Sequence, residues 1–269
     1  NELFKLNNRK NKININDLGY LIGPILNAGG RLGKSSYASE LLSTNNLEVV
    51  HTRSNELIKL NDKRKKIESL IISEIDFKKI ENENKDVIVY YNSNINEGLI
   101  GIIAARLKDY FNKPSIVITV SNELLKGSAR SIYNYNIGGV IKNLKDKNII
   151  ISGGGHNMAA GFTLEKGNLK NFEDFILKDY LKTGNSRNNV FTYDSEVSSL
   201  AFNHDFYSDI KKLEPFGTGN PIPTFLLKDL KIIKFRILKD KHISLILKSR
   251  TGFSIKSISF NSVNNKVGE

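Results

Sequence analysis

Two short apolar runs on either side of an amphipathic stretch constrain this chain more than any other feature. The runs DVIVYY (86–91) and KPSIVITVS (113–121) are rich in β-branched residues and are typical of buried strands. Between them, NEGLIGIIAARLKDYF (96–111) places apolar residues at helical spacing. A helix between two buried strands predicts a parallel βαβ unit, so we expect an α/β domain to begin here.

Further elements of this domain follow in the sequence. LLKGSARSI (124–132) predicts a third strand, and NIGGVIKNLK (136–145) a short helix. NIIISGGGHNMAAGFTLE (148–165) predicts a strand, a glycine turn and another strand. A helix over 169–182 is expected to close the domain, and TGNSRNN (183–189) is expected to be a linker.

The segment before the α/β domain has a helical period. Apolar residues three and four positions apart predict one amphipathic helix from about Arg53 to Lys79, long enough to connect two bodies. Upstream, LGYLIGPILNAGGRLGKSS (18–36) predicts a glycine-rich bend, followed by a short helix at 37–44.

The last segment is predicted to be mostly β. A strand (192–199), a helix (203–213) and the turn EPFGTGNPIP precede three strands over 224–239, 242–249 and 252–260. A shift of phase in the third strand suggests a bulge, and the alternation in the first places Phe235 with the core. Short strands with one basic side predict a small barrel such as an OB-fold.

Charge and composition bound the class of protein. The net charge is +12, which favours an anionic partner, although the abundance of Lys and Asn could reflect an AT-rich genome. Residues 228–256 hold nine basic residues against Asp229 and Asp240. The chain has no cysteine, which excludes disulfides and thiolate metal sites, and no apolar run long enough to span a bilayer. We expect a cytoplasmic protein, and, because the chain does not begin with Met, a fragment.

Three glycine-containing stretches are candidates for binding an anion. In GGGHNMAAG the glycines could expose backbone N–H groups beside His156, or could simply form a tight turn. In KGSARS, Ser128 and Arg130 lie two residues apart and share one face of a strand, which suits a phosphate clamp; an exposed edge arginine is the alternative. LNAGGRLGKSS offers Asn27, Arg31 and Lys34. The three together favour a phosphate site.

The sequence shows no motif for a metal centre. It has no Asp-His-His, His-x-x-x-His or HExxH pattern, and His51, His204 and His242 have no neighbouring ligands. We therefore expect half of a site, with any metal ligands outside this chain.

Five ordered motifs resemble those of one family. GPILNAGGRLG, NEGLIGIIAARL, GSARSI, GGGHNMAAG and EPFGTGNPIPTF resemble the C-terminal part of the RecJ family of single-stranded-DNA-specific 5′→3′ exonucleases, over about residues 17–262. The resemblance implies an α/β DHH-associated domain with a mixed sheet, preceded by a long connector helix and followed by an OB-fold-like barrel. We divide the chain into the end of a DHH domain (1–44), the connector (45–82), the DHH-associated domain (83–183) and an OB-like domain (190–269).

The resemblance also implies roles for particular residues. Ser128 and Arg130 match residues that bind the DNA 5′-phosphate. His156, with Gly154 and Gly155, matches a motif beside the metal site and the scissile phosphate, and Asn27 and Arg31 match a hinge motif. A basic DNA track is expected in the barrel, at Lys231, Lys234, Arg236, Lys241 and Lys248. Two positions depart from the family pattern: Ile25 stands where Arg is usual, and Asn96 where His is common.

The function implied is metal-dependent hydrolysis of single-stranded DNA in repair and recombination. The metal would be Mn²⁺ or Mg²⁺, held outside this chain, so the chain alone is expected to be inactive. Expected partners are single-stranded DNA with a 5′ end, a single-strand-binding protein and a helicase; a membrane is not expected, and the protein is expected to be a monomer. Two alternatives are a tRNA-binding module, as in alanyl-tRNA synthetases, and a phosphodiesterase for small oligonucleotides or cyclic dinucleotides. A purely single-strand-binding unit is a third.

Overall fold

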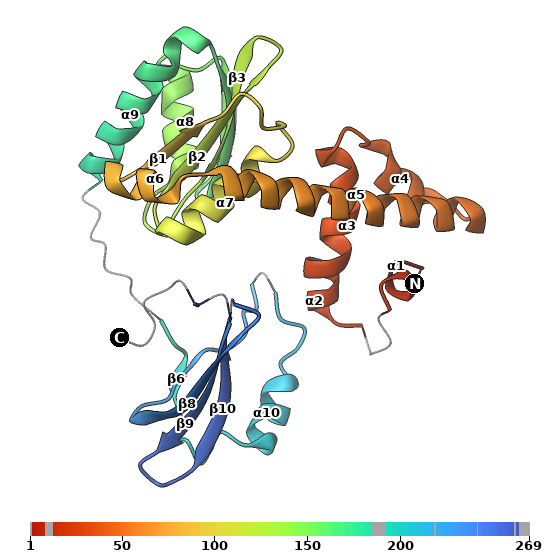
Figure 1. Ribbon diagram of the computed structural model, residues 1–269, viewed down its shortest axis with the longest axis vertical. Coiled ribbons are helices and arrows are strands. Elements are labelled where there is room, and N and C mark those ends of the chain that lie inside the picture. Colours follow the sequence, from red (N-terminus) through yellow and green to blue (C-terminus); the bar gives the residue numbers. More distant parts are fainter. Residues whose placement is uncertain are drawn as a thin grey trace. The chain divides into compact units, whose positions relative to one another are not determined.

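The protein consists of two compact units in the computed structural model (Figure 1). The first unit is Asn1–Arg187 and the second is Asn188–Glu269. The residues that the structure describes are 2–8, 13–183, 192–217, 219–240, 242–260 and 262–263. The expected linker at 183–189 lies, apart from Thr183, outside these residues.

The first unit begins with helices. They are α1 (Glu2–Leu6), α2 (Ile15–Asp17), the π-helical η1 (Leu18–Ile22), α3 (Gly23–Arg31), α4 (Ser36–Ser43), α5 (Leu47–Glu74) and α6 (Phe77–Glu83). α1, η1, α3, α4 and the first half of α5 share a small apolar core that includes Ile25 and Leu57. α5 starts where the Asn46 side chain accepts hydrogen bonds from the next turn, and it stops before Asp76, which caps α6 in the same way. The connector is therefore two helices rather than the single one expected.

The expected glycine-rich bend is wrong, because most of that stretch is helical. Pro24 stands in the first turn of α3, where its missing N–H costs nothing. Gly29 lets α3 pack closely: a Cβ there would lie 2.5 Å from the Lys34 carbonyl oxygen. Only the segment after Arg31 turns, at Gly33, which has a positive φ of 78°.

A five-stranded mixed sheet forms the centre of the first unit, in the order β1-β2-β3-β5-β4. The strands are β1 (Ile88–Tyr91), β2 (Ser115–Ser121), β3 (Leu124–Arg130), β4 (Ser152–His156) and β5 (Ala159–Leu164). β1 and β2 pair in parallel across α7 (Ile100–Phe111), which confirms the predicted βαβ unit; the other pairs are antiparallel.

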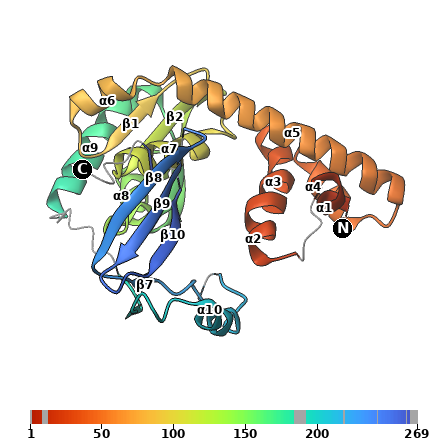
Figure 2. The ribbon, with the colours of Figure 1, turned by 60° about the horizontal axis from the view of Figure 1, so that its bottom comes forward.

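Helices cover the two faces of this sheet unequally. Figure 2 shows the long α5 leading from α3 and α4 to α6, which lies beside β1. α8 (Ile137–Asp146) and α9 (Leu169–Lys182) pack with one face in a large core that includes Phe162 and Phe172. On the other face, α7 packs over Ile88 and Val117 together with α5 and α6. The face of β3, β5 and β4 on the α7 side is therefore left largely open, and the candidate site lies there.

The glycines of the GGGH motif lie in a strand rather than in a turn. β4 contains Gly153, Gly154 and Gly155, and the turn that follows is Asn157–Met158. A Cβ on Gly155 would lie 2.3 Å from the Ala159 carbonyl oxygen, and one on Gly153 would lie 2.8 Å from Ile141. These two glycines are therefore needed for close packing, whereas Gly154 has open space beside it.

The second unit is β-rich. It contains β6 (Ser195–Glu196), α10 (His204–Lys211), β7 (Phe225–Leu226), β8 (Leu230–Leu238), β9 (His242–Ser249) and β10 (Ser254–Ser259). β8, β9 and β10 form an antiparallel sheet, and β6 pairs in parallel with β7. Within the residues described here, these strands do not form a closed barrel.

Two details of the second unit correct the sequence predictions. The strand expected over 224–239 is divided into β7 and β8. The break lies just before β8, where Asp229 has a positive φ of 57°. The bulge lies in β8, between Ile232 and Lys234, and not in the third strand. Phe235 was expected in the core, but its side chain is 66% exposed. No helix in the described part of the chain is long and apolar enough to cross a membrane.

Candidate nucleic-acid interface

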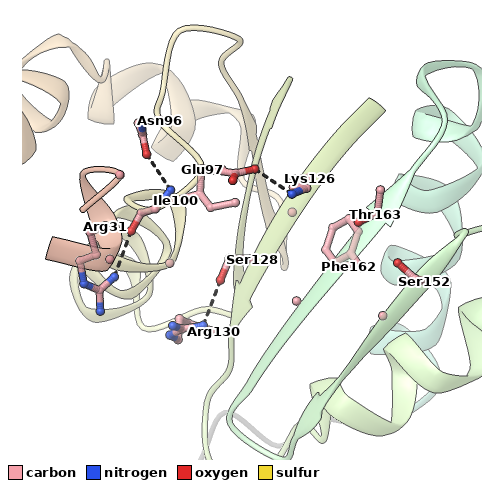
Figure 3. A pocket seen from close by; sticks show the side chains of 17 residues that line it. Arg31, Asn96, Glu97, Ile100, Lys126, Ser128, Arg130, Ser152, Phe162 and Thr163 are labelled. Carbon is pink, nitrogen blue, oxygen red and sulfur yellow. Dashed lines mark hydrogen bonds and ion pairs between the residues drawn. The ribbon is translucent and has the colours of Figure 1, made fainter. Parts of the chain in front are cut away.

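A cavity of about 650 Å³ opens on the α7 side of the sheet (Figure 3). Its wall is built by the end of α3, the loop before α7, and strands β3, β4 and β5. We call it the anion pocket. The side chains that give it its chemistry are Arg31, Asn96, Glu97, Lys126, Ser128, Arg130, Ser152 and Thr163.

Arg31 reaches the anion pocket from the last turn of α3. Its Nη1 donates a hydrogen bond to the Gly98 carbonyl oxygen at 3.0 Å. Gly98 also touches the main chain of Arg31, because a Cβ at position 98 would lie 2.4 Å from the Arg31 carbonyl oxygen. A side chain on residue 98 would push α3 away, so this glycine sets the place of Arg31.

Arg130 and Ser128 enter the pocket from β3, where alternate residues face the core. Nη1 of Arg130 donates to Ser128 Oγ at 3.1 Å and to the Ala129 carbonyl oxygen at 2.8 Å. Gly101 of α7 makes room for both side chains. A Cβ there would lie 2.9 Å from Arg130 Nη2 and 3.0 Å from Ser128 Oγ.

The charged forms of the two pocket arginines are destabilised by burial and by neighbouring positive charges. Burial lowers the pKa of Arg130, and the neighbouring charge of Arg31 lowers it further. Burial also lowers the pKa of Arg31, as does the charge of Arg64, while Glu68 opposes the shift. Neither Arg31 nor Arg130 forms an ion pair with a carboxylate among the described residues. Two half-buried guanidinium groups of like charge favour an anion between them.

The open face of β3, β5 and β4 continues from these arginines. The strand register aligns Arg130 with Ala159 and His156, and Ser128 with Gly161 and Gly154. Cβ atoms at Gly154 and Gly161 would meet nothing closer than 3.8 Å, so the centre of this face is flat and open. Two strand spacings separate Arg130 from His156, which amounts to about 10 Å.

His156 lines a second cavity, of about 460 Å³, rather than the anion pocket. This cavity lies between the edge strand β4 and α8, and Gly154, Gly155 and Lys142 also line it. The structure thus brings Arg31, Ser128 and Arg130 together, and it places Gly154, Gly155 and His156 on β4, two strands away from Arg130.

Asn27 and Lys34, the other two candidate side chains of the stretch LNAGGRLGKSS, do not line either cavity. Asn27 is exposed on α3, and Lys34 lies 5.8 Å from the ring of Tyr37. Ile25 is buried in the helical core, so this departure from the family pattern lies outside the pocket. Asn96 lines the pocket, and its Oδ1 accepts a hydrogen bond from the Gly98 N–H at 2.8 Å.

An ion pair at the far end of the pocket was not predicted from the sequence. Glu97 accepts hydrogen bonds from Lys126 at 2.9 Å and from Ser121 at 2.7 Å, and both contacts lower its pKa. Lys126 precedes Ser128 by two residues, so the alternation of β3 could have placed it on the same face.

A second cationic surface lies on the sheet of the second unit. Register pairs Lys231 with Lys248, and the bulge after Ile232 keeps Lys234 and Arg236 on that same face despite their odd spacing from Lys231. We call this the basic face; it comprises Lys231, Lys234, Arg236, Lys248 and Lys256, all exposed. Lys241 falls outside the described residues.

The other basic residues of this segment are partly neutralised. Lys228 pairs with Glu196 at 2.6 Å, and Arg250 pairs with Asp229 at 3.3 Å. The basic face forms no such pair within the described part of the chain.

The described residues do not suit a divalent metal. They include no cluster of three or more His, Asp or Glu side chains that could hold one. His51 contacts Glu2 and Asn55, and His204 contacts Ser208.

Comparison with known proteins gives two domains and several relatives. Residues 84–182 match the DHHA1 domain, and residues 193–268 match the RecJ OB domain. The single-stranded-DNA-specific exonuclease RecJ of Haemophilus influenzae is 31% identical over 259 residues, covering 91% of this chain and 45% of the relative. The protein of that name from Bacillus subtilis is 28% identical, covering 97% of this chain and 34% of the relative.

A solved structure shows the same fold. The crystal structure of RecJ in complex with Mn²⁺ from Thermus thermophilus superposes with a TM-score of 0.77 at 21% identity, covering all of this chain and 39% of that one. This chain thus spans less than half the length of these relatives. Its two domains and its similarity over nine-tenths of its length place the chain in the RecJ family, where it corresponds to the C-terminal part.

Proposed function

We propose that this chain supplies the DNA-holding part of a single-stranded-DNA-specific 5′→3′ exonuclease. In this role the anion pocket binds the 5′-terminal phosphate, and the basic face of the second unit binds the strand behind it. The observation that carries the proposal is the pair of half-buried arginines, Arg31 and Arg130, which converge with Ser128 on one cavity without a carboxylate partner among the described residues.

A terminal phosphate suits this pocket better than a phosphodiester. A phosphate monoester carries a charge of about −1.5 to −2 at neutral pH and presents three acceptor oxygens. Two guanidinium groups and a hydroxyl match both the charge and the donors. Holding the 5′ end in this way would set the direction of digestion, because the bond to be cut then lies at a fixed distance from that end.

His156 extends the proposal toward the reacting phosphate. It follows Arg130 and Ala159 in one row of the open face, so a nucleotide bound at the arginines would lie over the small residues between them. We assign His156, with the backbone of Gly154 and Gly155, to the phosphate at which cleavage occurs. Asn27, exposed on α3, remains a weaker candidate for a DNA contact.

The metal would be supplied by the rest of the protein. RecJ structures of Thermus thermophilus were solved with Mn²⁺ and with Mg²⁺, and the described residues of this chain offer no site for either ion. We therefore propose that the chain alone binds DNA without cutting it. Degradation of a labelled single strand by the purified chain with Mn²⁺ would contradict this.

The domain content favours this function over the alternatives. A tRNA-binding module or a small-oligonucleotide phosphodiesterase does not require the second unit, whereas residues 193–268 match the OB domain of RecJ. Roles in DNA repair and recombination, as a monomer beside a single-strand-binding protein and a helicase, belong to the same proposal.

The test is a fluorescence anisotropy titration with one oligonucleotide carrying either a 5′-phosphate or a 5′-hydroxyl. The wild-type chain should bind the phosphorylated strand more tightly. Arg130→Gln should lower that affinity by about 10- to 100-fold, because a charge-assisted hydrogen bond contributes about 1.5–3 kcal/mol, and should leave the 5′-hydroxyl strand almost unaffected.

The matched control is Lys170→Gln, which removes one positive charge from the exposed side of α9. It should leave the preference for the 5′-phosphate unchanged. Equal affinity of the wild-type chain for the two strands would contradict the proposed function.

A further inference from the structure

A buried carboxylate joins the long helix α5 to α7, close to the anion pocket. Oε1 of Glu68 lies 2.8 Å from Nε of Arg106 on α7, and Oε2 lies 2.7 Å from Nη1 of Arg64 on its own helix. The side chains of Glu68 and Arg64 are only 9% and 12% exposed, whereas that of Arg106 is 60% exposed. Asn61, also buried, accepts a hydrogen bond from Nε of Arg64 at 3.2 Å.

A buried ion pair contributes little net stability to a fold. Removing a carboxylate from water is unfavourable, and the attraction of its partners often only offsets that cost. An apolar pair of similar size could join the two helices as well. Unlike an apolar pair, however, this link is directional: one carboxylate oxygen fixes Arg64 on α5 and the other fixes Arg106 on α7.

The ion pair between Glu68 and Arg106 connects the two helices that position Arg31. α3, which carries Arg31, packs on α5, since a Cβ on Gly29 would lie 3.2 Å from Leu57. The Arg31 guanidinium is in turn tied to Gly98, just before α7. Arg31 is thus held from α5 on one side and from α7 on the other, and the distance between these helices sets its position.

Without a bound anion, Arg31 and Arg130 repel each other. Each is half-buried, and the charge of Arg31 lowers the pKa of Arg130. Repulsion of this kind tends to push α3 and its helical neighbours away from the sheet. A link between α5 and α7 that does not depend on the ligand would resist that push.

From this geometry we propose that Glu68, through its ion pair with Arg106, is a positioning residue that holds α5 against α7 and thereby keeps Arg31 opposite Arg130 in the anion pocket. The inference rests on the proposed function, since it concerns how the 5′-phosphate site is assembled.

A simple charge effect predicts the opposite result, which makes the inference testable. If Glu68 acted only as a negative charge near the pocket, its removal would raise the affinity for every oligonucleotide. If it positions Arg31, its removal lowers the preference for the 5′-phosphate, while the affinity for the 5′-hydroxyl strand, which depends on the basic face, changes little.

The experiment measures that preference, the ratio of the two dissociation constants, for Glu68→Gln, Arg106→Gln and the double variant. Each single variant should reduce the ratio at least fivefold, and the double variant should reduce it no further, because both changes break the same link. Arg106→Lys, which keeps the charge, should restore part of the ratio. Since Arg106 is mostly exposed, its variants test the idea even if Glu68→Gln folds poorly.

The control is Glu56→Gln on the same helix, which breaks the pair between Glu56 and Arg53 but does not reach α7. It should leave the ratio unchanged. The inference is overturned if Arg106→Gln keeps the wild-type ratio while Arg130→Gln abolishes it. If the wild-type chain itself shows no preference, the proposed function fails, and the inference falls with it.

Discussion

The anion pocket and the basic face are both cationic, but they are built in different ways. In the pocket, Arg31 and Arg130 are half-buried, and each is held by hydrogen bonds of 2.8–3.1 Å to main-chain or hydroxyl oxygens. Glycines at 98 and 101 leave room for them. On the basic face, four lysines and one arginine project from an exposed sheet without ion-pair partners within the described residues.

This difference in construction allows one chain to combine recognition of a strand end with general affinity for DNA. Fixed guanidinium groups lose little freedom on binding and accept only an anion of the right shape. Mobile lysines on an open surface attract any phosphate, and salt weakens that attraction. We therefore expect the pocket to determine which end of a strand is bound, and the basic face to determine how tightly the strand is held overall.

The largest expected effect comes from filling the pocket. Gly101→Val should displace both Arg130 and Ser128, because even a Cβ would lie within 3.0 Å of each. We expect the affinity for a 5′-phosphorylated strand to fall by about 10- to 100-fold, to that of the 5′-hydroxyl strand, as measured by anisotropy.

Gly167→Val is the control for this change, because Gly167 has open space around it outside both cavities. If the Gly101→Val variant keeps its preference for the phosphorylated end, the two arginines are not the binding groups, and the contrast between the anion pocket and the basic face is contradicted.

The second effect separates the two surfaces. Changing Lys231, Lys234 and Arg236 together to Gln should weaken binding of both strands equally and leave their ratio unchanged. Each phosphate contact on a single strand adds about 0.7 to the slope of log affinity against log salt, so the slope should fall by about 2. A change in the ratio, measured at two or more salt concentrations, would show that the basic face also recognises the 5′ end.

The smallest effect concerns pH. Arginine stays protonated throughout the physiological range even where burial lowers its pKa, as it does for Arg31 and Arg130. The terminal phosphate loses its second proton at about pH 6. The preference for a 5′-phosphate should therefore rise severalfold between pH 5 and pH 7.5. A preference that falls over this range would contradict the assignment of the 5′-phosphate to the two arginines.

Much of the fold could be predicted from the sequence, because its apolar periods are clear. The βαβ unit, β3, α8 and α9 lie close to their expected positions, since short β-branched runs and helical spacing have few alternative structures. Two of the errors came from glycine. GPILNAGGR was expected to bend but is helical, and the GGGH glycines lie in a strand, because in both places they allow close packing rather than a turn.

The candidate site was harder to predict, because it depends on contacts between distant segments. Spacing on one strand was enough to group Ser128 with Arg130. Nothing local indicated that Gly98 and Gly101 would make room for two arginines, or that Arg31, rather than Asn27 or Lys34, would line the cavity. The basic face also depended on a bulge whose position the alternation of β8 did not reveal.

The most direct test of the account is to observe the arginine side chains during binding. Nuclear magnetic resonance signals of the arginine Nε–H groups, assigned through Arg31→Lys and Arg130→Lys, should be recorded while a short oligonucleotide is added. We predict that a 5′-phosphorylated strand shifts the signals of Arg31 and Arg130, and that the same strand with a 5′-hydroxyl shifts mainly that of Arg236. If both strands shift only Arg236 and leave the two pocket arginines unchanged, the anion pocket does not hold the 5′ end.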